Sequence, residues 1–484
     1  MPLRAGLILV LGFVELTVLL VLWRKFYDHQ RQTMSPLNTE TKHDEGGNVL
    51  KPLNVTKQLI ITAVATNKVT MCLFQRRISD ICNILSSEEN ENKLVYQNIY
   101  RILNTVMINP NCWLTSLVQN CALFRFAHGY DDKPVTQEEL AFPLAFGIRM
   151  HKSAEQAEQL LRSIYRPHNV YCIHVDMKAK NSVFEIIKNI SRCFKNIFVI
   201  EDRESIVYSG SGVIKAEMKC MLACLNSGIK WKYYLNLSGQ EFPLRTNLEI
   251  VMILKLFQGA NDIEAYDYPK HQEERFKKRY ISSGYRLVKT HIDKPPFGYN
   301  IQMSKGSAYG MFSRRFAEFL LTDDVANKLT KWLDDTCSPE ENIWSTLNSL
   351  PWAPGGYYVE TRHSSNTHAS RSLIWRWDKV KCYGRFIRSV CVFSFKDLPW
   401  LKSQPHVIAN KFDINDVDRV VVDCLESMLL KRIHHPLLQT VDRNYFMNLP
   451  QLRFYRKLNE TMKSTRFLNQ VKQKWMKEHP WKIF

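Results

Sequence analysis

The sequence predicts an α/β fold with a doubly wound, largely parallel sheet. Apolar segments of strand length alternate with segments of helical periodicity, and the connections between them are short. This alternation is typical of parallel strands joined by crossover helices. Ligands bind such sheets at the carboxyl ends of the strands, so polar residues at these ends are the first candidates for a functional site.

The first helix and strands of this pattern lie between residues 153 and 200. "SAEQAEQLLRSIY" starts with Ser153 as an N-cap, has Gln156 three residues later, and carries Leu and Ile at helical spacing. "VYCIHVD" (170–176) is predicted to be a buried strand, and "NIFVI" (196–200) is predicted to be another. Asp176 therefore falls at the ligand-binding edge.

Two further helices and a strand continue the alternation. "IKAEMKCMLACLNSG" predicts a helix that stops at Gly228, and "KYYLNLSG" (232–239) predicts a buried strand. "TNLEIVMILKLFQG" predicts a helix that is capped by Thr246 or Asn247 and ends at Gly259. The "SGQEF" turn follows the strand, which adds this turn to the same edge of the sheet.

The chain is strongly basic, with a formal net charge of +19 over 484 residues. Such a charge favours acidic partners, namely nucleic acid, an anionic membrane, or phosphate-bearing and sialylated ligands, without choosing among them. The C-terminal extension, residues 435–484, is both basic and aromatic. It fits either a surface helix with a tail or a contact with an acidic or membrane surface.

Residues 6–23 are apolar except for Glu15 and Thr17, and they are just long enough to span a bilayer. No small-residue cleavage site follows, so we expect an uncleaved signal anchor rather than a cleaved signal peptide. The Lys and Arg residues on the two sides of this segment oppose a lumenal C-terminal part. The predicted organisation is a short cytoplasmic tail, a transmembrane anchor, a flexible stem, an α/β domain and the C-terminal extension, at residues 1–5, 6–23, 24–70, 71–434 and 435–484.

Cysteines and sequons fit a lumenal environment. The sequence has twelve cysteines, which indicate disulfides behind a membrane anchor, and it has no CxxC pair that would suggest zinc. Asn54, Asn189 and Asn459 lie in sequons and are candidates for glycosylation. A fourth sequon, at Asn236, lies in a predicted buried strand and is not expected to be used.

Motif searches exclude several reaction classes. No GxxxxGK[ST], HExxH or GxSxG motif occurs, so neither a nucleotide-dependent kinase nor a serine hydrolase is supported. The D-x-D pair of Asp416 and Asp418 does not end an apolar strand, so we expect ordinary surface carboxylates there rather than a metal site. A bound diphosphate would then need Arg or Lys to meet its charge.

The stretch "DDTCSPEENIWSTL" (334–347) has the features of a helix start. Ser338 suits the N-cap, Pro339 suits the first helical position, and Glu341 suits the acid of a capping box. Glu340 is predicted to be a first-turn carboxylate that interacts favourably with the helix dipole. These structural roles leave open whether Glu341 also does chemistry.

A set of ordered motifs resembles one enzyme family. "YYLNLSGQEFPLRTNLEI" (233–250) resembles the β-1,6-N-acetylglucosaminyltransferases that build core 2 O-glycan and I-antigen branches, which form glycosyltransferase family 14. The resemblance runs from about Cys82 to Cys424. The other stretches that agree with the family, in the same order, are "AFPLAFGIRMHKSAEQAEQLLRSIYRPHNVYCIHVD", "EERFKKRY", "GSAYGMFSRR", "SPEENIWSTL", "RSVCVF" and "ANKFD".

The resemblance implies a GT-A-like glycosyltransferase domain with a mixed, mostly parallel sheet flanked by helices, behind an N-terminal transmembrane helix. It implies a single-pass type II protein of the Golgi apparatus membrane with a lumenal catalytic domain, which replaces the orientation that the basic residues favour. The implied reaction is inverting transfer of N-acetylglucosamine from UDP-GlcNAc, in β-1,6 linkage, to galactose- or GalNAc-containing O-glycans of glycoproteins. The family needs no metal or other cofactor, and no nucleic-acid partner is expected.

The family's motifs also imply roles for single residues. Glu341 would be the catalytic base that takes the proton from the acceptor's carbon-6 hydroxyl. Arg388 and Lys411 would hold the diphosphate in place of a metal. The rest of the donor site would comprise Arg149, Met150, His151, Asp176, Met177, Lys178 and Tyr208, and the acceptor site Glu264, Arg275, Trp375 and Trp377. The implied disulfides are Cys82–Cys424, Cys121–Cys193, Cys172–Cys220 and Cys382–Cys391.

Some positions depart from the family pattern. Gln272 stands where acceptor-binding relatives have Lys, Trp377 replaces a Tyr, and Arg149 replaces a small apolar residue. The loop before "DLPW" reads "SFK" where relatives have small residues. These departures leave open a related transferase with another acceptor or donor, or an inactive sugar-binding Golgi protein on the same fold. A nucleic-acid binder would explain the charge but not the anchor, sequons or cysteines.

Overall fold

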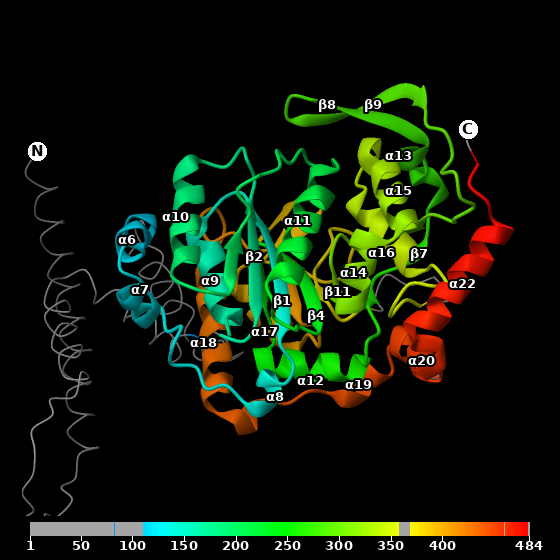
Figure 1. The fold of residues 1–484 in the computed structure, drawn as a ribbon. Helices are drawn as coiled ribbons and strands as arrows, with labels where there is room; N and C mark the ends of the chain where they lie inside the picture. The colour runs from blue at the N-terminus through cyan, green and yellow to red at the C-terminus, as the bar shows by residue number, and fades with distance from the viewer. Residues whose placement is uncertain (1–81, 83–109, 358–367, 459, 483–484) are drawn as a thin grey trace, which may run out of the picture. The chain divides into compact units, whose positions relative to one another are not determined.

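The computed structural model describes residues 82, 110–357, 368–458 and 460–482 (Figure 1). Its helices are α6 (Pro110–Leu117), α7 (Cys121–Ala127), α8 (Gln137–Leu140), α9 (Ala154–Ile164), α10 (Asn181–Arg192), α11 (Gly212–Asn226), α12 (Asn247–Phe257), α13 (Glu274–Lys277), α14 (Arg314–Thr322), α15 (Asp324–Trp332), α16 (Glu340–Asn348), α17 (Leu398–Ser403), α18 (Val420–His434), α19 (Arg443–Met447), α20 (Pro450–Lys457), α21 (Glu460–Lys463) and α22 (Thr465–Glu478). Its strands are β1 (Leu144–Met150), β2 (Val170–Val175), β3 (Ile197–Val199), β4 (Tyr233–Ser238), β5 (Glu241–Pro243), β6 (Asp262–Ile263), β7 (Tyr266–Asp267), β8 (Lys278–Ser283), β9 (Arg286–Asp293), β10 (Ser304–Lys305), β11 (Gly310–Ser313), β12 (Arg371–Ser372), β13 (Arg385–Ile387), β14 (Val390–Val392) and β15 (Ile408–Asn410).

A six-stranded sheet with the order β3-β2-β1-β4-β11-β6 forms the centre of the domain. β3, β2, β1 and β4 are parallel, with Ala145 opposite Val170 and Leu144 opposite Tyr233. β11 runs antiparallel between β4 and β6. The predicted mixed, mostly parallel sheet is confirmed.

The predicted helices form where their caps indicated. Ser153 accepts a hydrogen bond from the Gln156 N–H at the start of α9. Thr246, rather than Asn247, caps α12 and forms a capping box with Glu249. Gly228, just beyond α11, has φ +79°, a conformation that costs glycine little.

Helices cover both faces of the sheet (Figure 1). Alternate residues of β1 point to opposite faces, as strand geometry requires. Phe146 and Ile148 join the core beneath α9, α10 and α12, whereas Ala145 joins the core that includes α11, α14 and α16. A third core packs α17 and α18 around Phe242 and Phe412.

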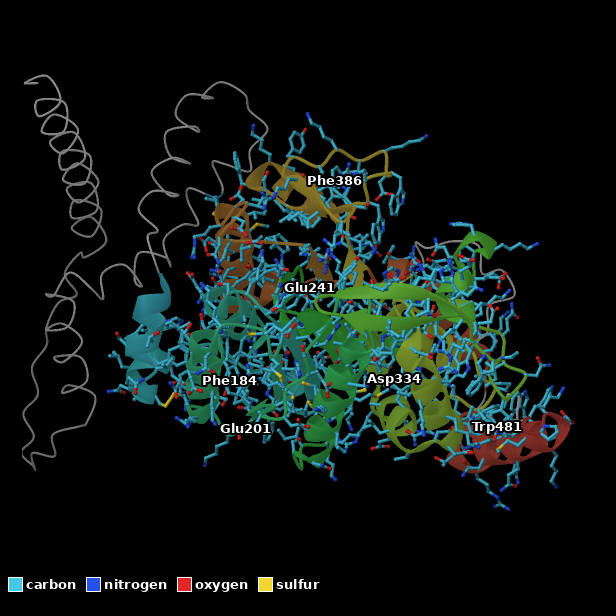
Figure 2. The ribbon with its side chains drawn as sticks, turned by 90° about the horizontal axis from the view of Figure 1, so that it is seen from above. Phe184, Glu201, Glu241, Asp334, Phe386 and Trp481 are labelled. Carbon is cyan, nitrogen blue, oxygen red and sulfur yellow. A yellow bond between two sulfur atoms is a disulfide. The ribbon has the colours of Figure 1, made fainter. Side chains whose placement is uncertain are left out.

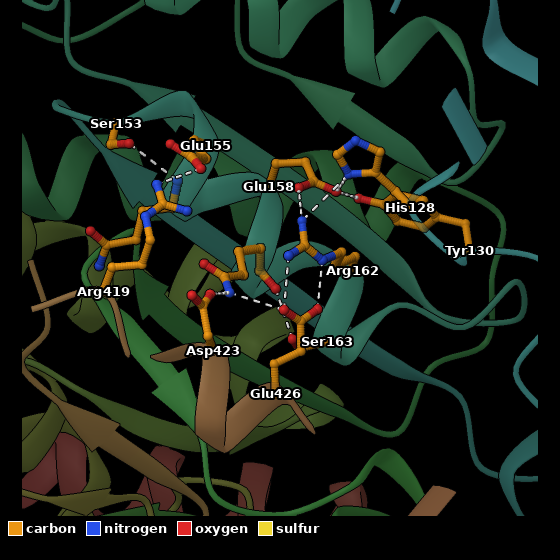
Figure 3. Close-up of polar contacts among 12 residues, drawn as sticks. His128, Tyr130, Ser153, Glu155, Glu158, Arg162, Ser163, Arg419, Asp423 and Glu426 are labelled. Carbon is orange, nitrogen blue, oxygen red and sulfur yellow. Dashed lines mark hydrogen bonds and ion pairs between the residues drawn. The ribbon is translucent and has the colours of Figure 1, made fainter. Parts of the chain in front are cut away.

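A buried polar network joins α18 to α9 (Figure 3). Arg162 forms an ion pair with Glu426 at 2.5 Å, and Gln159 donates a hydrogen bond to Asp423 at 2.7 Å. Burial raises the pKa of the Asp423 carboxyl to about 7. The network fixes the C-terminal part of the domain against the helix that follows β1.

Three of the four implied disulfides are present, namely Cys82–Cys424, Cys121–Cys193 and Cys382–Cys391. The fourth pairing, Cys172–Cys220, is not formed. The packing of α11 on β2 brings the two buried sulfur atoms to 2.7 Å, a separation longer than the ~2.05 Å of a disulfide bond. Cys224 and Cys337 are also free thiols.

The C-terminal extension packs on the domain through its aromatic residues. Trp475 of α22 lies 4.9 Å from Trp352, and Trp481 lies 4.8 Å from Tyr299, measured between ring centroids. Lys472 forms an ion pair with Asp323 at 2.7 Å. This packing favours the surface-helix interpretation of the extension.

Several predictions fall outside the described residues, namely the tail, the anchor at 6–23, the stem at 24–70, and the sequons at Asn54 and Asn459. No helix in the described ranges is long and apolar enough to cross a membrane. Asn189 lies in α10, partly exposed. Asn236 is fully buried in β4, where its amide donates to the Ala308 carbonyl.

Candidate active site

The segment before α16 does not form the predicted capping box. Ser338 has φ +50°, in the left-handed region, and its carbonyl, not its side chain, accepts the Glu341 N–H. The residue before α16 is Pro339, whose side chain cannot cap the helix. The predicted capping box of Ser338 and Glu341 was therefore wrong. In the left-handed conformation of Ser338, its backbone carbonyl and not its hydroxyl accepts the Glu341 N–H. The side chain of Glu341 is released from this structural role.

Two cations hold Glu341 instead. Arg275 Nη1 lies 2.8 Å from Glu341 Oε2, and Lys305 Nζ contacts the same oxygen. Lys305, in β10, is buried, and the next residue, Gly306, donates its N–H to the Glu341 carbonyl at 2.7 Å. Lys305 could not be predicted from a local pattern, because it belongs to a two-residue strand. The predicted base and the predicted acceptor residue Arg275 are thus in direct contact.

Two more carboxyl groups lie close to this ion pair. Burial, reinforced by the charge of Glu341, raises the pKa of Glu264 to about 8, although Lys305 opposes the shift. Burial and the same neighbouring charge raise the pKa of Glu340 to about 7, and Glu340 Oε2 is buried without a hydrogen-bond partner within the described residues. Glu340 does lie in the first turn of α16, as predicted, but its carboxyl also faces the group around Glu341. At neutral pH the three acids carry fewer than three negative charges.

Arg388 stands at the tip of the β13–β14 hairpin. Ile387 pairs with Val390, so Arg388 and Ser389 form a two-residue turn, and both have positive φ values, 51° and 67°. Such a turn usually takes Asn and Gly, and residues held in this costly conformation are common at functional sites. The Arg388 guanidinium lies 3.6 Å from the ring centroid of Tyr208. Two predicted donor-binding residues therefore meet across a cation–π contact.

Lys411 follows β15 and lies near Arg388. Burial, together with the charges of Arg388 and Lys152, lowers the pKa of Lys411. Asn410, the preceding residue, donates to Glu241 Oε1 at 2.8 Å, and Glu241 also accepts the Ser238 N–H at the end of β4. Glu241, in the "SGQEF" turn, thus links the end of β4 to the end of β15, directly before Lys411.

Figure 2, seen from above, shows Glu241 between Phe386 of the hairpin and Asp334 of the segment before α16. Glu241 is fully buried and is paired with the equally buried Arg371 at 2.8 Å. A buried ion pair of this kind costs free energy when one partner is removed. The Glu241–Arg371 pair is therefore a buried structural support beside the candidate site.

Asp176 organises the loop at the end of β2. Its carboxylate accepts the Lys178 N–H at 2.9 Å and pairs with Lys178 Nζ at 3.2 Å. Met177 is half exposed beside it. Burial, followed by the charges of Lys411 and Lys152, lowers the pKa of His151. His151 and Asp176 are therefore close to the group that Arg388 and Lys411 define.

Arg149 and Met150, at the end of β1, make their contacts inside the domain. Arg149 Nε pairs with Glu217 Oε2 at 2.6 Å, and its guanidinium lies 5.6 Å from the Tyr309 ring centroid. The Met150 side chain is buried in the core. Both side chains thus have partners within the domain, and the place of this segment in the donor site stays a prediction.

A backbone hydrogen bond joins the predicted donor-binding residues around Arg388 to the segment that carries Glu341. Ser338 donates its N–H to the carbonyl of Ser209 at 2.7 Å, and Ser209 directly follows Tyr208. The loop that carries Tyr208 thus rests on the turn that releases Glu341. Residues from many separate stretches of chain gather here, at the edge where the sheet topology predicts a ligand site.

Trp375 and Trp377 stack on each other with ring centroids 4.9 Å apart and planes 8° from parallel. Trp375 bridges to Val390 of the hairpin, and Trp377 is 69% exposed. Within the described residues, no ring contact, hydrogen bond or ion pair joins the two tryptophans to Glu341. The structure associates the aromatic pair with the hairpin that carries Arg388.

The D-x-D pair is not a pair of surface carboxylates. Asp416 is exposed and pairs with Lys152 at 3.0 Å, but Asp418 is buried and accepts the backbone N–H groups of Phe395 and Val420. The prediction was wrong for Asp418, because the "SFK" loop needs a buried acceptor. Asp418 therefore supports the loop that follows the hairpin.

Cations and carboxyl groups gathered at the strand ends of a mostly parallel α/β sheet are typical of an enzyme active site. The family model of the Core-2/I-Branching enzyme matches residues 144–402, more than half of the chain. The chain belongs to the Core-2/I-branching enzyme family.

Relatives of known activity agree with this family. The chain is 37% identical over 339 residues to a human β-1,3-galactosyl-O-glycosyl-glycoprotein β-1,6-N-acetylglucosaminyltransferase, covering 67% of this chain and 78% of the relative. It is 36% identical to the zebrafish (Danio rerio) enzyme numbered 4, covering 65% and 76% of the two chains, and 34% identical to the human enzyme numbered 3, covering 65% and 74%. The predicted family is thereby confirmed.

Proposed function

We propose that this protein is an inverting β-1,6-N-acetylglucosaminyltransferase that branches O-glycans on glycoproteins, with UDP-GlcNAc as the donor. The observation that carries the proposal is Glu341, which is released from capping α16 and held by Arg275 and Lys305. The names of the relatives support the reaction class. By the family resemblance, the protein acts in the Golgi lumen behind an N-terminal anchor.

Glu341 is the general base in this proposal. A sugar hydroxyl is a poor nucleophile, and a positioned carboxylate that takes its proton during attack accelerates such a step by about 10²–10⁴-fold. The acceptor's carbon-6 oxygen forms a bond to the anomeric carbon of GlcNAc while the bond from that carbon to the UDP oxygen breaks. The single in-line displacement inverts the α-linked donor to a β-linked product.

Arg388 and Lys411 bind the diphosphate and stabilise its growing charge as UDP leaves. Their mutual proximity supports this role, since two cations lie together beside the exposed ring of Tyr208. Fixed cations can replace a metal ion in stabilising a leaving group. We therefore propose that transfer needs no divalent metal.

Glu264 and Arg275 contact the acceptor in the proposal, and the stacked Trp375 and Trp377 offer a flat surface to a sugar. Because the pKa of Glu264 is about 8, it is protonated at neutral pH and donates one hydrogen bond to a sugar oxygen. Which O-glycan fits depends on the departures at Gln272 and Trp377.

A transfer assay tests the proposed function. The full-length protein in detergent is incubated with UDP-GlcNAc and galactosyl-β-1,3-GalNAc, with and without EDTA, and the product linkage is determined by NMR. We expect a β-1,6-linked GlcNAc at equal rates in both conditions. No transfer to this or any other O-glycan core would contradict the proposed activity, and loss of transfer in EDTA alone would contradict the metal-free mechanism.

A further inference from the structure

A cavity lies at the opposite end of the sheet from the candidate active site. This cavity of about 600 Å³ opens beside Tyr233, where β4 begins, and beside Ser313, where the antiparallel β11 ends. β4 spans about 17 Å from Tyr233 to Ser238 at its other end. In Figure 1 α12 lies along the lower end of the sheet, and the β8–β9 hairpin lies above it. The cavity is therefore separate from the group around Glu341.

The C-terminal extension builds one wall of this cavity. Tyr455, Lys463 and Ser464, all from the extension, line it together with α12 and the start of α14. Arg315 of α14 holds this wall in place, since its guanidinium donates to the Lys463 carbonyl and to the Thr465 hydroxyl. The basic, aromatic extension has no role in the proposed reaction, but it forms part of this cavity.

The lining carries more positive than negative charge. Lys255, Arg314 and Lys463 are each paired with an acid, namely Glu138, Glu318 and Glu460. Arg315 bonds only to neutral groups, and within the described residues Lys230 and Lys232 have neither a hydrogen bond nor an ion pair from their side chains. Three cationic side chains therefore remain without a balancing acid. A cavity of this charge attracts a ligand with more than one negative charge.

The cavity is large and partly apolar. Lys230 and Lys232, just before β4, are exposed on either side of the fully buried Trp231. Leu254, Tyr233 and Tyr455 close the floor as buried side chains. A volume of about 600 Å³ is in the range of sites for organic ligands of drug size, well above the need of a single inorganic anion.

We propose that this cavity, which we call the rear basic cavity, binds an acidic oligosaccharide, either sialylated or sulfated, that is carried by the acceptor glycoprotein. The identity of the ligand as a glycan rests on the proposed function, because a glycoprotein substrate presents several glycans to one enzyme. A glycan held in the rear basic cavity raises the effective concentration of neighbouring acceptor glycans at the active site. The cavity thereby selects acidic, densely glycosylated acceptors.

Binding to the full-length protein tests the cavity directly. The probes are 3′-sialyllactose, a sulfated tetrasaccharide, neutral lactose and inorganic phosphate, titrated at low and high NaCl concentration. The variant is Lys230→Ala with Lys232→Ala, and the matched control is Lys195→Ala with Lys402→Ala, which removes two exposed lysines elsewhere. We expect an acidic oligosaccharide to bind the parent, to bind about tenfold more weakly to the variant, and to bind unchanged to the control.

The two acidic probes distinguish the source of the charge, and either one supports the proposal if salt weakens its binding. Equal binding to variant and parent, binding of lactose as tight as that of the acidic probes, or binding of phosphate alone would overturn the proposal. Transfer to a neutral disaccharide gives the independent readout. If transfer fails while the variant still loses acidic-glycan binding, the proposed cavity site is supported and the proposed reaction is contradicted. If transfer succeeds and no acidic glycan binds the parent, the proposed reaction is supported and the proposed cavity site is contradicted.

Discussion

The carboxyl groups around Glu341 differ in the charges that surround them. Glu341 contacts both Arg275 and Lys305, whereas Glu264 and Glu340 are partly buried and have raised pKa values of about 8 and 7. Environments that push neighbouring pKa values apart separate acid and base roles. Glu264 is thus suited to donate a hydrogen bond, while the two cations orient the Glu341 carboxylate.

The raised pKa of Glu264 predicts how acceptor binding depends on pH. Below pH 8 the carboxyl keeps its proton and can donate to a sugar oxygen; above pH 8 it becomes an anion beside Glu341 and loses the donor. We expect the KM for the acceptor to rise by about tenfold from pH 7 to pH 9. Glu264→Gln, which keeps an N–H donor at every pH, flattens this rise.

Steady-state kinetics with saturating donor measure both profiles. Because the donor site also titrates, the KM for UDP-GlcNAc is followed in parallel as the control. A rise in acceptor KM that is the same in Glu264→Gln and in the parent would show that another group is responsible.

Single-residue roles at the site follow from sequence only in part. The motifs correctly brought Glu341, Arg275 and Glu264 together, but the capping box was wrong, since a positive φ at Ser338 is not encoded by any turn residue nearby. Lys305 was missed because two-residue strands have no periodicity to detect. Such contacts depend on tertiary packing, which a local pattern does not record.

At the scale of elements, the β13–β14 hairpin carries the most information about function. Its tight turn holds Arg388 and Ser389 in a conformation that lacks the usual Asn or Gly, and it places Arg388 over Tyr208. α9 and α12 were predictable because cap residues mark their starts, whereas this hairpin has only short strands and an unusual turn. The turn fixes a cation at the point where the diphosphate is proposed to bind.

Removing Arg388 tests the element. Arg388→Ala should weaken UDP binding by roughly 10–100-fold, because a charge-assisted contact to a phosphate is lost. Arg385→Ala removes an exposed arginine from the same hairpin and serves as the matched control. Isothermal titration with UDP measures both. Equal losses in the two variants would indicate a general charge effect and not a specific contact.

At the scale of the whole molecule, the fold joins distant parts of the chain by covalent and buried polar links. Cys82–Cys424 spans 342 residues, and the Arg162–Glu426 pair couples α9 to α18. The sheet class and the three disulfides could be predicted from alternation and motifs. The strand order, with β11 between β4 and β6, could not, since it depends on long-range pairing between short strands.

Cys82–Cys424 and Cys382–Cys391 close loops of very different length, so they should contribute differently to the free energy of unfolding. In the chain-entropy model, Cys82–Cys424 contributes about 6 kcal/mol and Cys382–Cys391, with a separation of nine residues, contributes about 3 kcal/mol. Paired Cys→Ala variants compared by thermal unfolding should show the larger loss of Tm for the first pair. A larger loss for Cys382 and Cys391 would argue that local packing, not loop closure, sets the effect.

The central claim is that Glu341 is the base of a sugar transfer at this site. The direct measurement compares Glu341→Gln with the neighbouring Glu340→Gln in kcat for transfer from UDP-GlcNAc, with UDP affinity and Tm measured for each variant. We expect Glu341→Gln to lower kcat by about 10²–10⁴-fold while UDP affinity stays within about twofold, and Glu340→Gln to keep most of the activity. Transfer by Glu341→Gln at the rate of the parent would contradict the account.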